Sequence, residues 1–352
     1  MKQQFEQMID VLAEQRSLSV EQYEALIANC TPELAEYAAG LARQVACAVY
    51  GNAIYIRGLI ELSNYCANNC YYCGIRRSNN TCERYRLTPE QALECADTGY
   101  ELGFRTFVLQ GGEDPYLTDE HLVPLVAALH AAHPDCAITL SLGERTPESY
   151  AALRGAGAER YLLRQEAASP ELYSRIHPSE LSHANRMECL HTLRELGYVV
   201  GCGFMVGVPH QTAAHLAADL KFIEEFAPGM CGIGPFVPHH ATAYAAESAG
   251  SVELTCFLLS LLRLMHPTLL LPATTALGTL DAHGREKGVL AGANVVMPNL
   301  SPVDVREKYE LYNNKACTGA ESAEFVHELG ERMASIGYDV LVDRGDPKGG
   351  AR

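Results

Sequence analysis

Eight short β-prone runs alternate with helical patterns along most of this chain of 352 residues. The runs are rich in branched and aromatic residues, whereas the segments between them repeat apolar residues at helical spacing. An α/β unit used eight times predicts a parallel sheet closed into a (β/α)8 TIM-type barrel, with an open doubly wound sheet as the alternative. The expected strands are Tyr55–Ser63, Phe104–Gln110, Cys136–Leu142, Arg160–Arg164, Val199–Val206, Cys231–Phe236, Leu269–Thr274 and Asn294–Pro298.

The residues that open and close the expected helices support this alternation. Thr88-Pro89-Glu90-Gln91 is a capping box with proline at the first helical position, and its helix is expected to end at Gly103, directly before a strand. Thr146-Pro147 and Gly157 frame a later helix in the same way. Because the chemistry of such a barrel gathers at the carboxyl ends of its strands, the residues that follow each strand are the first candidates for a site.

Both ends of the chain are expected to lie outside the repeating unit. Residues 1–50 predict an N-terminal helical extension, since apolar residues recur at helical spacing and Thr31-Pro32 opens a further helix. We expect the barrel to span residues 51–340, with a last helix from about Ala320 to Ile336 that closes it. Residues 341–352 are expected to form a flexible tail.

The charge and the cysteine content exclude several classes of protein. The formal net charge is −16 with no run of Lys or Arg, so neither nucleic acid nor an anionic membrane is an expected partner. No apolar stretch of roughly 18 residues predicts a membrane span, and no secretory signal follows Met1, so we expect a cytoplasmic protein. The 13 Cys residues are scattered, and most of them are expected to be buried, reduced thiols.

Three cysteines stand apart from the others. Cys66, Cys70 and Cys73 directly follow the first expected strand, which places them in the first loop at the carboxyl end of the barrel. Three thiolates can hold a 4Fe-4S cluster and leave its fourth iron open to another ligand. A zinc site is the alternative and would need a fourth ligand such as Cys82, although zinc motifs usually pair their ligands.

The triad and several other stretches resemble the radical S-adenosylmethionine (SAM) superfamily and, more narrowly, its HydE family. The matching stretches are Cys70–Arg77 (CYYCGIRR), Leu109–Tyr116 (LQGGEDPY), Thr139–Glu144 (TLSLGE), Tyr161–Glu166 (YLLRQE), Gly232–His239 (GIGPFVPH), Pro272–Thr279 (PATTALGT) and Val296–Asn299 (VMPN). The likeness runs from about Tyr55 to Tyr312. Biotin synthase and methylornithine synthase share the barrel and the triad, but not this whole set.

The resemblance implies SAM as a cofactor beside the 4Fe-4S cluster. The residues expected to contact SAM are Gly111, Gly112, Glu113, Glu166, Arg186 and Tyr309. Glycines in the Gly-Gly-Glu turn allow a backbone carbonyl to approach a bound ammonium, with an ordinary turn as the alternative. Glu166 is suited to the ammonium or ribose hydroxyls of SAM and Arg186 to its carboxylate, with a plain salt bridge as the alternative.

A second set of residues is expected to line the substrate cavity. They are Thr139, Arg164, Met230, Thr274, Thr275, Met297 and Tyr312. Arg164 points the same way as Glu166 and suits an anionic substrate, while the threonine hydroxyls suit cyanide, carbonyl or carboxylate groups. The alternatives are ordinary β-forming threonines and core-filling methionines. Tyr309 and Tyr312 are expected on one face of a helical turn, with simple packing as the alternative.

The HydE family implies reductive cleavage of SAM to a 5′-deoxyadenosyl radical during assembly of the diiron site of the FeFe-hydrogenase H-cluster. Its substrate is expected to be a cysteine-bound iron complex with CO and cyanide. The expected partners are a flavodoxin- or ferredoxin-type reductant and the other hydrogenase maturases.

Two alternatives to this function remain open. One is an enzyme like biotin synthase or methylornithine synthase that acts on a small organic substrate, and the other is a non-catalytic iron-sulfur scaffold. Some HydE proteins carry further cysteines near the carboxyl end that bind a second cluster. Only Cys317 follows Cys256 here, so no second cluster is expected.

Overall fold

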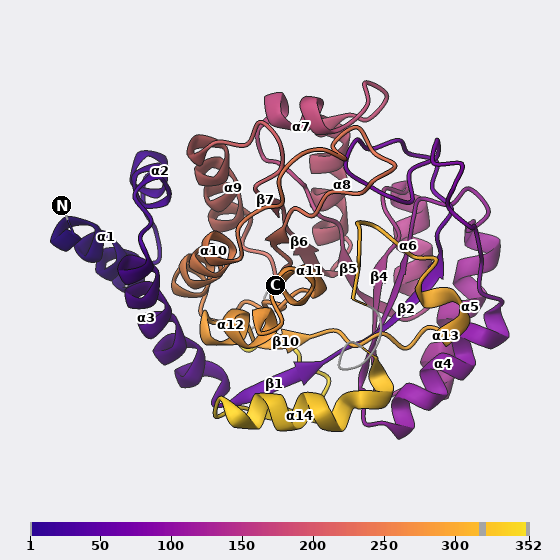
Figure 1. The fold of residues 1–352 in the computed structure, drawn as a ribbon. Helices are drawn as coiled ribbons and strands as arrows, with labels where there is room; N and C mark the ends of the chain where they lie inside the picture. The colour runs from indigo at the N-terminus through magenta and orange to yellow at the C-terminus, as the bar shows by residue number, and fades with distance from the viewer. Residues whose placement is uncertain (1, 317–321, 350–352) are drawn as a thin grey trace.

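Parallel strands that alternate with helices make up most of this computed structural model, which describes residues 2–316 and 322–349 (Figure 1). The strands are β1 (Ala53–Ile56), β2 (Gly58–Ser63), β3 (Thr106–Gly111), β4 (Ala137–Ser141), β5 (Ala158–Leu162), β6 (Val199–Cys202), β7 (Met205–Val206), β8 (Met230–Cys231), β9 (Gly234–Pro235), β10 (Val295–Val296) and β11 (Asp339–Leu341). The largest sheet has the order β2-β3-β4-β5-β6-β8, and every neighbouring pair in it is parallel.

Isolated parallel bridges close this sheet into a barrel. The bridges are Met230–Leu270, Pro272–Val295 and Leu59–Asn299. They lead from β8 through the segment 270–272 to β10 and back to β2, so eight parallel segments form a closed ring. The predicted (β/α)8 barrel is confirmed, and the open sheet is excluded.

Several expected strands are shorter or divided in the structure. The seventh, Leu269–Thr274, is present only as bridges, and Pro272 within it has no N–H group to donate to a neighbouring strand. The expected strand Val199–Val206 divides into β6 and β7 at Gly203, which has a φ of +151° and approaches the chain so closely that an added Cβ would lie 2.0 Å from the Gly232 carbonyl oxygen.

Helices surround the barrel and begin largely where the sequence predicts. They are α1 (Lys2–Gln15), α2 (Val20–Ala28), α3 (Pro32–Tyr50), α4 (Pro89–Glu101), α5 (Asp119–Ala132), α6 (Pro147–Gly155), α7 (Pro170–Ile176), α8 (His183–Glu195), α9 (Ala213–Phe226), α10 (Val252–Met265), α11 (Thr275–Leu280), α12 (Gly284–Leu290), α13 (Val303–Arg306), η2 (Ala323–Phe325) and α14 (Val326–Ser335). The Thr88 capping box with Gln91 is present, and the Thr146 side chain caps α6 by accepting from the Ser149 backbone N–H. No helix in the described parts of the chain is long and apolar enough to cross a bilayer.

The first three helices lie against the outside of the barrel beside α9 and α10 (Figure 1). Tyr23 of α2 donates to the Glu224 carboxylate of α9 at 2.7 Å, and Arg16 donates to the Leu264 carbonyl of α10 at 2.7 Å. The helical extension predicted for residues 1–50 is therefore present over its described part and packs on the barrel wall.

The carboxyl-terminal segment packs at the amino-terminal end of the barrel, where β11 pairs with β1. Asp346 accepts from Arg160 Nη2 at 2.6 Å, and the Arg344 carbonyl accepts from Thr106 Oγ1 at 2.7 Å. The described residues from 341 on are therefore packed, whereas a flexible tail was expected. The reason is that Arg160 is buried in the barrel and needs an acceptor. The expected last helix corresponds to η2 and α14, while residues 320 and 321 at its start, like Cys317, lie outside the described residues.

Candidate active site

The cysteine loop, residues 64–86, follows β2 and is hydrogen-bonded to three other segments at the carboxyl end of the barrel. The Ala67 N–H donates to the Glu113 carbonyl at 2.8 Å, and the Gly74 N–H donates to the Leu311 carbonyl at 2.8 Å. The Tyr71 N–H donates to the carbonyl at the end of α7, at 3.1 Å. Backbone contacts far apart in sequence therefore fix the loop that carries Cys66, Cys70 and Cys73.

Two polar side chains brace this loop from within. The Arg84 guanidinium donates to the carbonyl oxygens of Asn64, Ile75, Arg76 and Asn79. The Asn64 amide donates to the carbonyls of Glu83 and Lys308 at 2.8 and 2.7 Å, and its oxygen accepts from the Tyr85 N–H. Neither set of contacts could be predicted from the sequence, because a lone Arg or Asn in a loop carries no signal of the carbonyls it will meet.

The three thiols fit a cluster of several iron atoms. Burial raises the pKa of each thiol, to about 12 for Cys70, and the charge of a neighbouring cysteine raises the pKa of Cys70 and Cys73 further. A thiol in this setting loses its proton only to a metal. A structural zinc site would need a fourth protein ligand, whereas three thiolates suffice for a cubane whose fourth iron stays open.

The Gly-Gly-Glu turn at the end of β3 touches the cysteine loop. A Cβ on Gly112 would lie 2.2 Å from the Tyr65 carbonyl oxygen and 2.7 Å from Cys66 Cβ, so only glycine fits. Gly111 is less restricted, since its nearest neighbours would lie 3.3 Å away. Burial raises the pKa of Glu113, and Arg186 partly offsets this.

Arg186 of α8 is held between two carboxylates. Its Nε donates to Glu144 at 2.5 Å, its Nη2 lies 3.7 Å from Glu113 Oε1, and its Nη1 donates to the Arg164 carbonyl at 3.0 Å. Although burial alone would lower the pKa of Arg186, the Glu144 and Glu113 carboxylates raise it. Glu144 lies in the matched stretch TLSLGE, but the sequence analysis did not select it, because its partner is 42 positions away.

Arg164 and Glu166 lie just beyond β5, and their side chains meet in an ion pair. Arg164 Nη2 is 3.1 Å from Glu166 Oε2, but the geometry makes no hydrogen bond, and both atoms are buried without a hydrogen-bond partner. Glu166 also has a φ of +64°, a conformation that costs a non-glycine residue about 1 kcal/mol. Unpaired polar groups on a strained residue are typical of a ligand site.

Two of the three predicted threonines also have unpaired hydroxyls. Thr139 in β4 and Thr274 just before α11 each have a buried Oγ1 with no hydrogen-bond partner. Thr274 is the N-cap of α11 but makes no side-chain capping bond, and a Cβ on Gly234 would lie 2.7 Å from its hydroxyl. Thr275 is the first residue of α11.

The predicted methionines lie in a different setting. Met230 and Met297 pack in an apolar cluster with Tyr50 and Tyr55, and Met230 Sδ accepts from the buried Arg57 at 3.0 Å. This cluster lies toward β1, so the packing also fits the core-filling alternative. Their contact with a substrate stays a prediction.

The two predicted tyrosines follow α13 in an irregular segment, so the expectation of one face of a helical turn is wrong. Tyr309 is buried, packs beside Cys73, and its hydroxyl accepts from Gln110 at 3.4 Å. The backbone around it is held by Lys315, which donates to the Tyr309 carbonyl and pairs with the buried Glu61 of β2. Tyr312 is half-buried. Lys315 and Glu61 were also missed, because their charges meet only in the fold.

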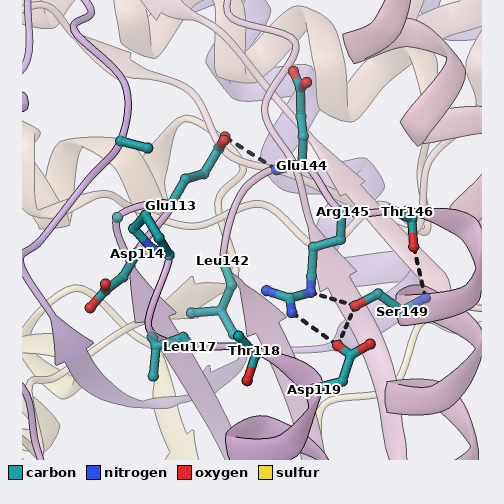
Figure 2. A pocket seen from close by; sticks show the side chains of 13 residues that line it. Glu113, Asp114, Leu117, Thr118, Asp119, Leu142, Glu144, Arg145, Thr146 and Ser149 are labelled. Carbon is teal, nitrogen blue, oxygen red and sulfur yellow. Dashed lines mark hydrogen bonds and ion pairs between the residues drawn. The ribbon is translucent and has the colours of Figure 1, made fainter.

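A pocket of about 420 Å³ opens beside the Gly-Gly-Glu turn, and Figure 2 shows its lining. It reaches from Ala67 of the cysteine loop and the Gly112–Glu113 turn to the start of α6. Glu113 Oε1 accepts from the Glu144 N–H at 3.1 Å along one side. Asp119, Arg145 and Ser149 form a hydrogen-bonded group along the other side.

Comparisons with known proteins agree on one superfamily. The model of the radical SAM superfamily matches residues 60–223. The [FeFe] hydrogenase maturase subunit HydE of Thermotoga maritima is 45% identical over 277 residues, which cover 79% of each chain. The 3-methylornithine synthase of Methanosarcina barkeri is 28% identical over 85% of this chain and 84% of its own. A crystal structure of methylornithine synthase superposes with a TM-score of 0.83 and 26% identity, covering 95% of this chain and 97% of that one.

Proposed function

This chain belongs to the radical SAM superfamily and, within it, to the family of the HydE maturase, and we propose that it acts in assembly of the diiron site of FeFe-hydrogenase. It is a radical SAM enzyme that uses a 4Fe-4S cluster and SAM. When bound, these groups supply a one-electron cleavage of the sulfonium to methionine and a 5′-deoxyadenosyl radical. Cys66, Cys70 and Cys73 would hold the cluster.

One observation carries the SAM chemistry in this proposal, the contact between the cysteine loop and the Gly-Gly-Glu turn, while the likeness to HydE carries the maturase role. Because Gly112 lies against Tyr65 and Cys66, and the Ala67 N–H donates to the Glu113 carbonyl, an amino acid bound at this turn would lie beside the three thiolates. Arg186 Nη2 makes only the longer ion pair to Glu113 among the described residues, so this atom would meet the SAM carboxylate. Glu166 would accept from the ammonium or ribose hydroxyls of SAM.

The unpaired groups inside the barrel support an anionic or strongly accepting substrate. Arg164 offers two buried donor atoms without hydrogen bonds, one of them ion-paired with Glu166, and Thr139 and Thr274 add two hydroxyls. Cyanide, carbonyl and carboxylate groups would accept from these donors. We propose that Thr275, Met230, Met297 and Tyr312 complete the lining and that Tyr309 contacts SAM.

Two experiments test the function in order. First, the protein reconstituted with iron and sulfide under anaerobic conditions and reduced with dithionite is expected to form 5′-deoxyadenosine from SAM. A loaded cluster that never cleaves SAM would instead support the non-catalytic scaffold. Second, hydrogenase apoprotein produced with the other maturases is expected to gain activity only when this chain is added. Failure of the second test alone would leave a radical SAM enzyme with another substrate.

The likeness to methylornithine synthase favours one rival, a small organic substrate. Mass spectrometry of the reaction with a filtered cell extract distinguishes the two. New 3-methylornithine together with unchanged hydrogenase maturation would overturn the maturase proposal.

The cysteine loop also supports an acidic protein as the electron donor. Between residues 64 and 86 the chain carries four Arg and one Glu, a net charge of +3, whereas the whole chain carries −16. Arg77 is an exposed residue of this loop. We expect Arg77→Glu to slow SAM cleavage driven by reduced flavodoxin, mainly at low salt, and to leave the dithionite-driven rate unchanged. An equal loss with both reductants would contradict a docking role.

A further inference from the structure

A buried carboxyl group on α9 lies behind the active site and outside the residues assigned to it. Asp219 is fully buried, and its Oδ1 accepts from the Ala168 N–H at 2.7 Å and from Gln165 Nε2 at 3.3 Å. Its Oδ2 has no hydrogen-bond partner. A carboxyl group in the interior is costly, so a chain that keeps one there usually uses it.

The two residues bonded to Asp219 flank Glu166. Gln165 precedes it, and its side-chain Oε1 accepts from the Gly203 N–H at 2.8 Å. Ala168 follows it by two positions. The Glu166 N–H itself donates to the Gly203 carbonyl at 3.1 Å. Asp219 is therefore hydrogen-bonded to the residues on both sides of Glu166, and the Gly203 carbonyl accepts from the Glu166 N–H.

The same segment carries the other groups of the site. Arg164 lies one residue before Gln165, pairs with Glu166, and accepts through its carbonyl from Arg186. A strained backbone persists only where its surroundings hold it. Without the acceptor on Asp219, the Ala168 N–H would be left without this partner, and the segment 164–168 would be free to relax to an unstrained conformation.

We infer that Asp219 is a positioning residue, which acts through Gln165 and Ala168 to hold Glu166 and Arg164 in their facing orientation. The inference about the backbone stands on the hydrogen bonds alone. Its consequence for SAM and substrate binding rests on the proposed function.

The charge of this carboxyl group responds to pH near neutrality. Burial raises the pKa of Asp219 to about 7, while its two hydrogen bonds and Arg164 lower it and Glu166 raises it. The charge of Asp219 also contributes to the raised pKa of the Cys202 thiol in β6, which burial raises most. Because an ionised carboxylate accepts more strongly, the segment is expected to be held more tightly as the pH rises through 7.

Three variants test the inference. Asp219→Leu removes the acceptor, Asp219→Asn keeps an acceptor but removes the charge, and Ser260→Ala is a control that loses a buried hydrogen bond of α10 to the Ala291 carbonyl. Hydrogen exchange of the segment 164–168 is measured without SAM, so that this readout does not depend on the proposed function. SAM affinity is measured on the reconstituted protein between pH 6 and pH 8.

The leucine variant is expected to speed exchange in 164–168 selectively and to weaken SAM binding by roughly tenfold or more, because small displacements of binding groups are costly. The asparagine variant is expected to keep slow hydrogen exchange in 164–168. Its SAM affinity is expected to lose the pH dependence around pH 7. The control is expected to change neither quantity.

Three results would overturn the inference. The first is a folded leucine variant whose hydrogen exchange in 164–168 equals that of the wild type. The second is a leucine variant whose exchange rises equally throughout the barrel. The third is an asparagine variant whose SAM affinity keeps its pH dependence. If the leucine variant does not fold, the asparagine variant alone decides. A wild-type protein that shows no SAM cleavage would count against the proposed function and not against the hydrogen-exchange result.

Discussion

Two neighbouring regions at the carboxyl end of the barrel differ in how completely their buried charged groups are paired and hydrogen-bonded. Around Arg186 the charges are matched, since its guanidinium contacts Glu144, Glu113 and a backbone carbonyl. Around Arg164 the match is incomplete, because Arg164 and Glu166 form an ion pair while several buried polar atoms there have no hydrogen-bond partner. A matched network holds its own geometry, whereas an unmatched one gains stability from a ligand. The first region therefore serves as a framework that also offers Arg186 Nη2 to SAM, and the second as a binding surface that a ligand completes.

The framework includes the cysteine loop, and the largest effect is expected there. Cys70→Ala should abolish cluster-dependent absorbance and all SAM cleavage, because two thiolates cannot replace the three that hold the cluster. Cys256→Ala, in α10 and far from the loop, is the matched control and should keep both. SAM cleavage that survives in the Cys70 variant would contradict the assigned ligands.

The contact between the cysteine loop and the Gly-Gly-Glu turn predicts the next largest effect. Gly112→Ala places a methyl group 2.2 Å from the Tyr65 carbonyl oxygen, so the loop must move. We expect a loss of about 2–4 kcal/mol in the free energy of unfolding and poor cluster incorporation. Gly111→Ala, with 3.3 Å to its nearest neighbours, should lose much less. Equal behaviour of the two variants in denaturant titration would refute the close contact.

Removing each arginine in turn tests the comparison itself. Arg186→Met leaves two carboxylates without their buried partner and should lower the free energy of unfolding by about 3 kcal/mol at neutral pH. Burial already raises the pKa of Glu113, and this carboxyl would take up a proton more readily without the arginine. Its folded pKa would then exceed the unfolded value further, so the cost should shrink as the pH falls toward 5.

Arg164→Met is the matched substitution in the unmatched region. It leaves one carboxylate, that of Glu166, without its ion pair, and should lower the free energy of unfolding by about 1 kcal/mol, less than Arg186→Met, while removing substrate turnover. A stability loss as large as that of Arg186→Met would show that the two regions do not differ.

The smallest stability effect is expected at the unpaired hydroxyls. Thr274→Val removes a buried hydroxyl without a hydrogen bond, so unfolding in denaturant should change by less than about 0.5 kcal/mol. Thr255→Val, whose hydroxyl donates to the Ser251 carbonyl at 2.7 Å, should cost about 1 kcal/mol. A Thr274 variant that is clearly less stable than the Thr255 variant would mean that the hydroxyl serves the framework.

The barrel and the cysteine loop could be predicted because their signals are local. Strand and helix periodicity, the Thr88 cap and the spacing of the triad are all read within a few residues. The number of segments in the ring, eight, was predicted correctly, although the seventh segment is too irregular to count as a strand.

The missed features depend on contacts that local patterns do not encode. Glu144 meets Arg186 from 42 positions away, and Asp346 meets Arg160 from 186 positions away. The Arg160 contact also explains why the end of the chain packs where a flexible tail was expected. Asp219 was overlooked for the same reason, since an acidic residue in an amphipathic helix is ordinarily solvent-exposed.

Electron paramagnetic resonance of the reduced, reconstituted protein tests the central claim most directly, together with iron and zinc analysis. The account predicts one 4Fe-4S signal per chain that changes when SAM is added and is absent from the Cys70→Ala variant. Bound zinc in place of iron, or an iron-sulfur signal that SAM leaves unchanged, would contradict it.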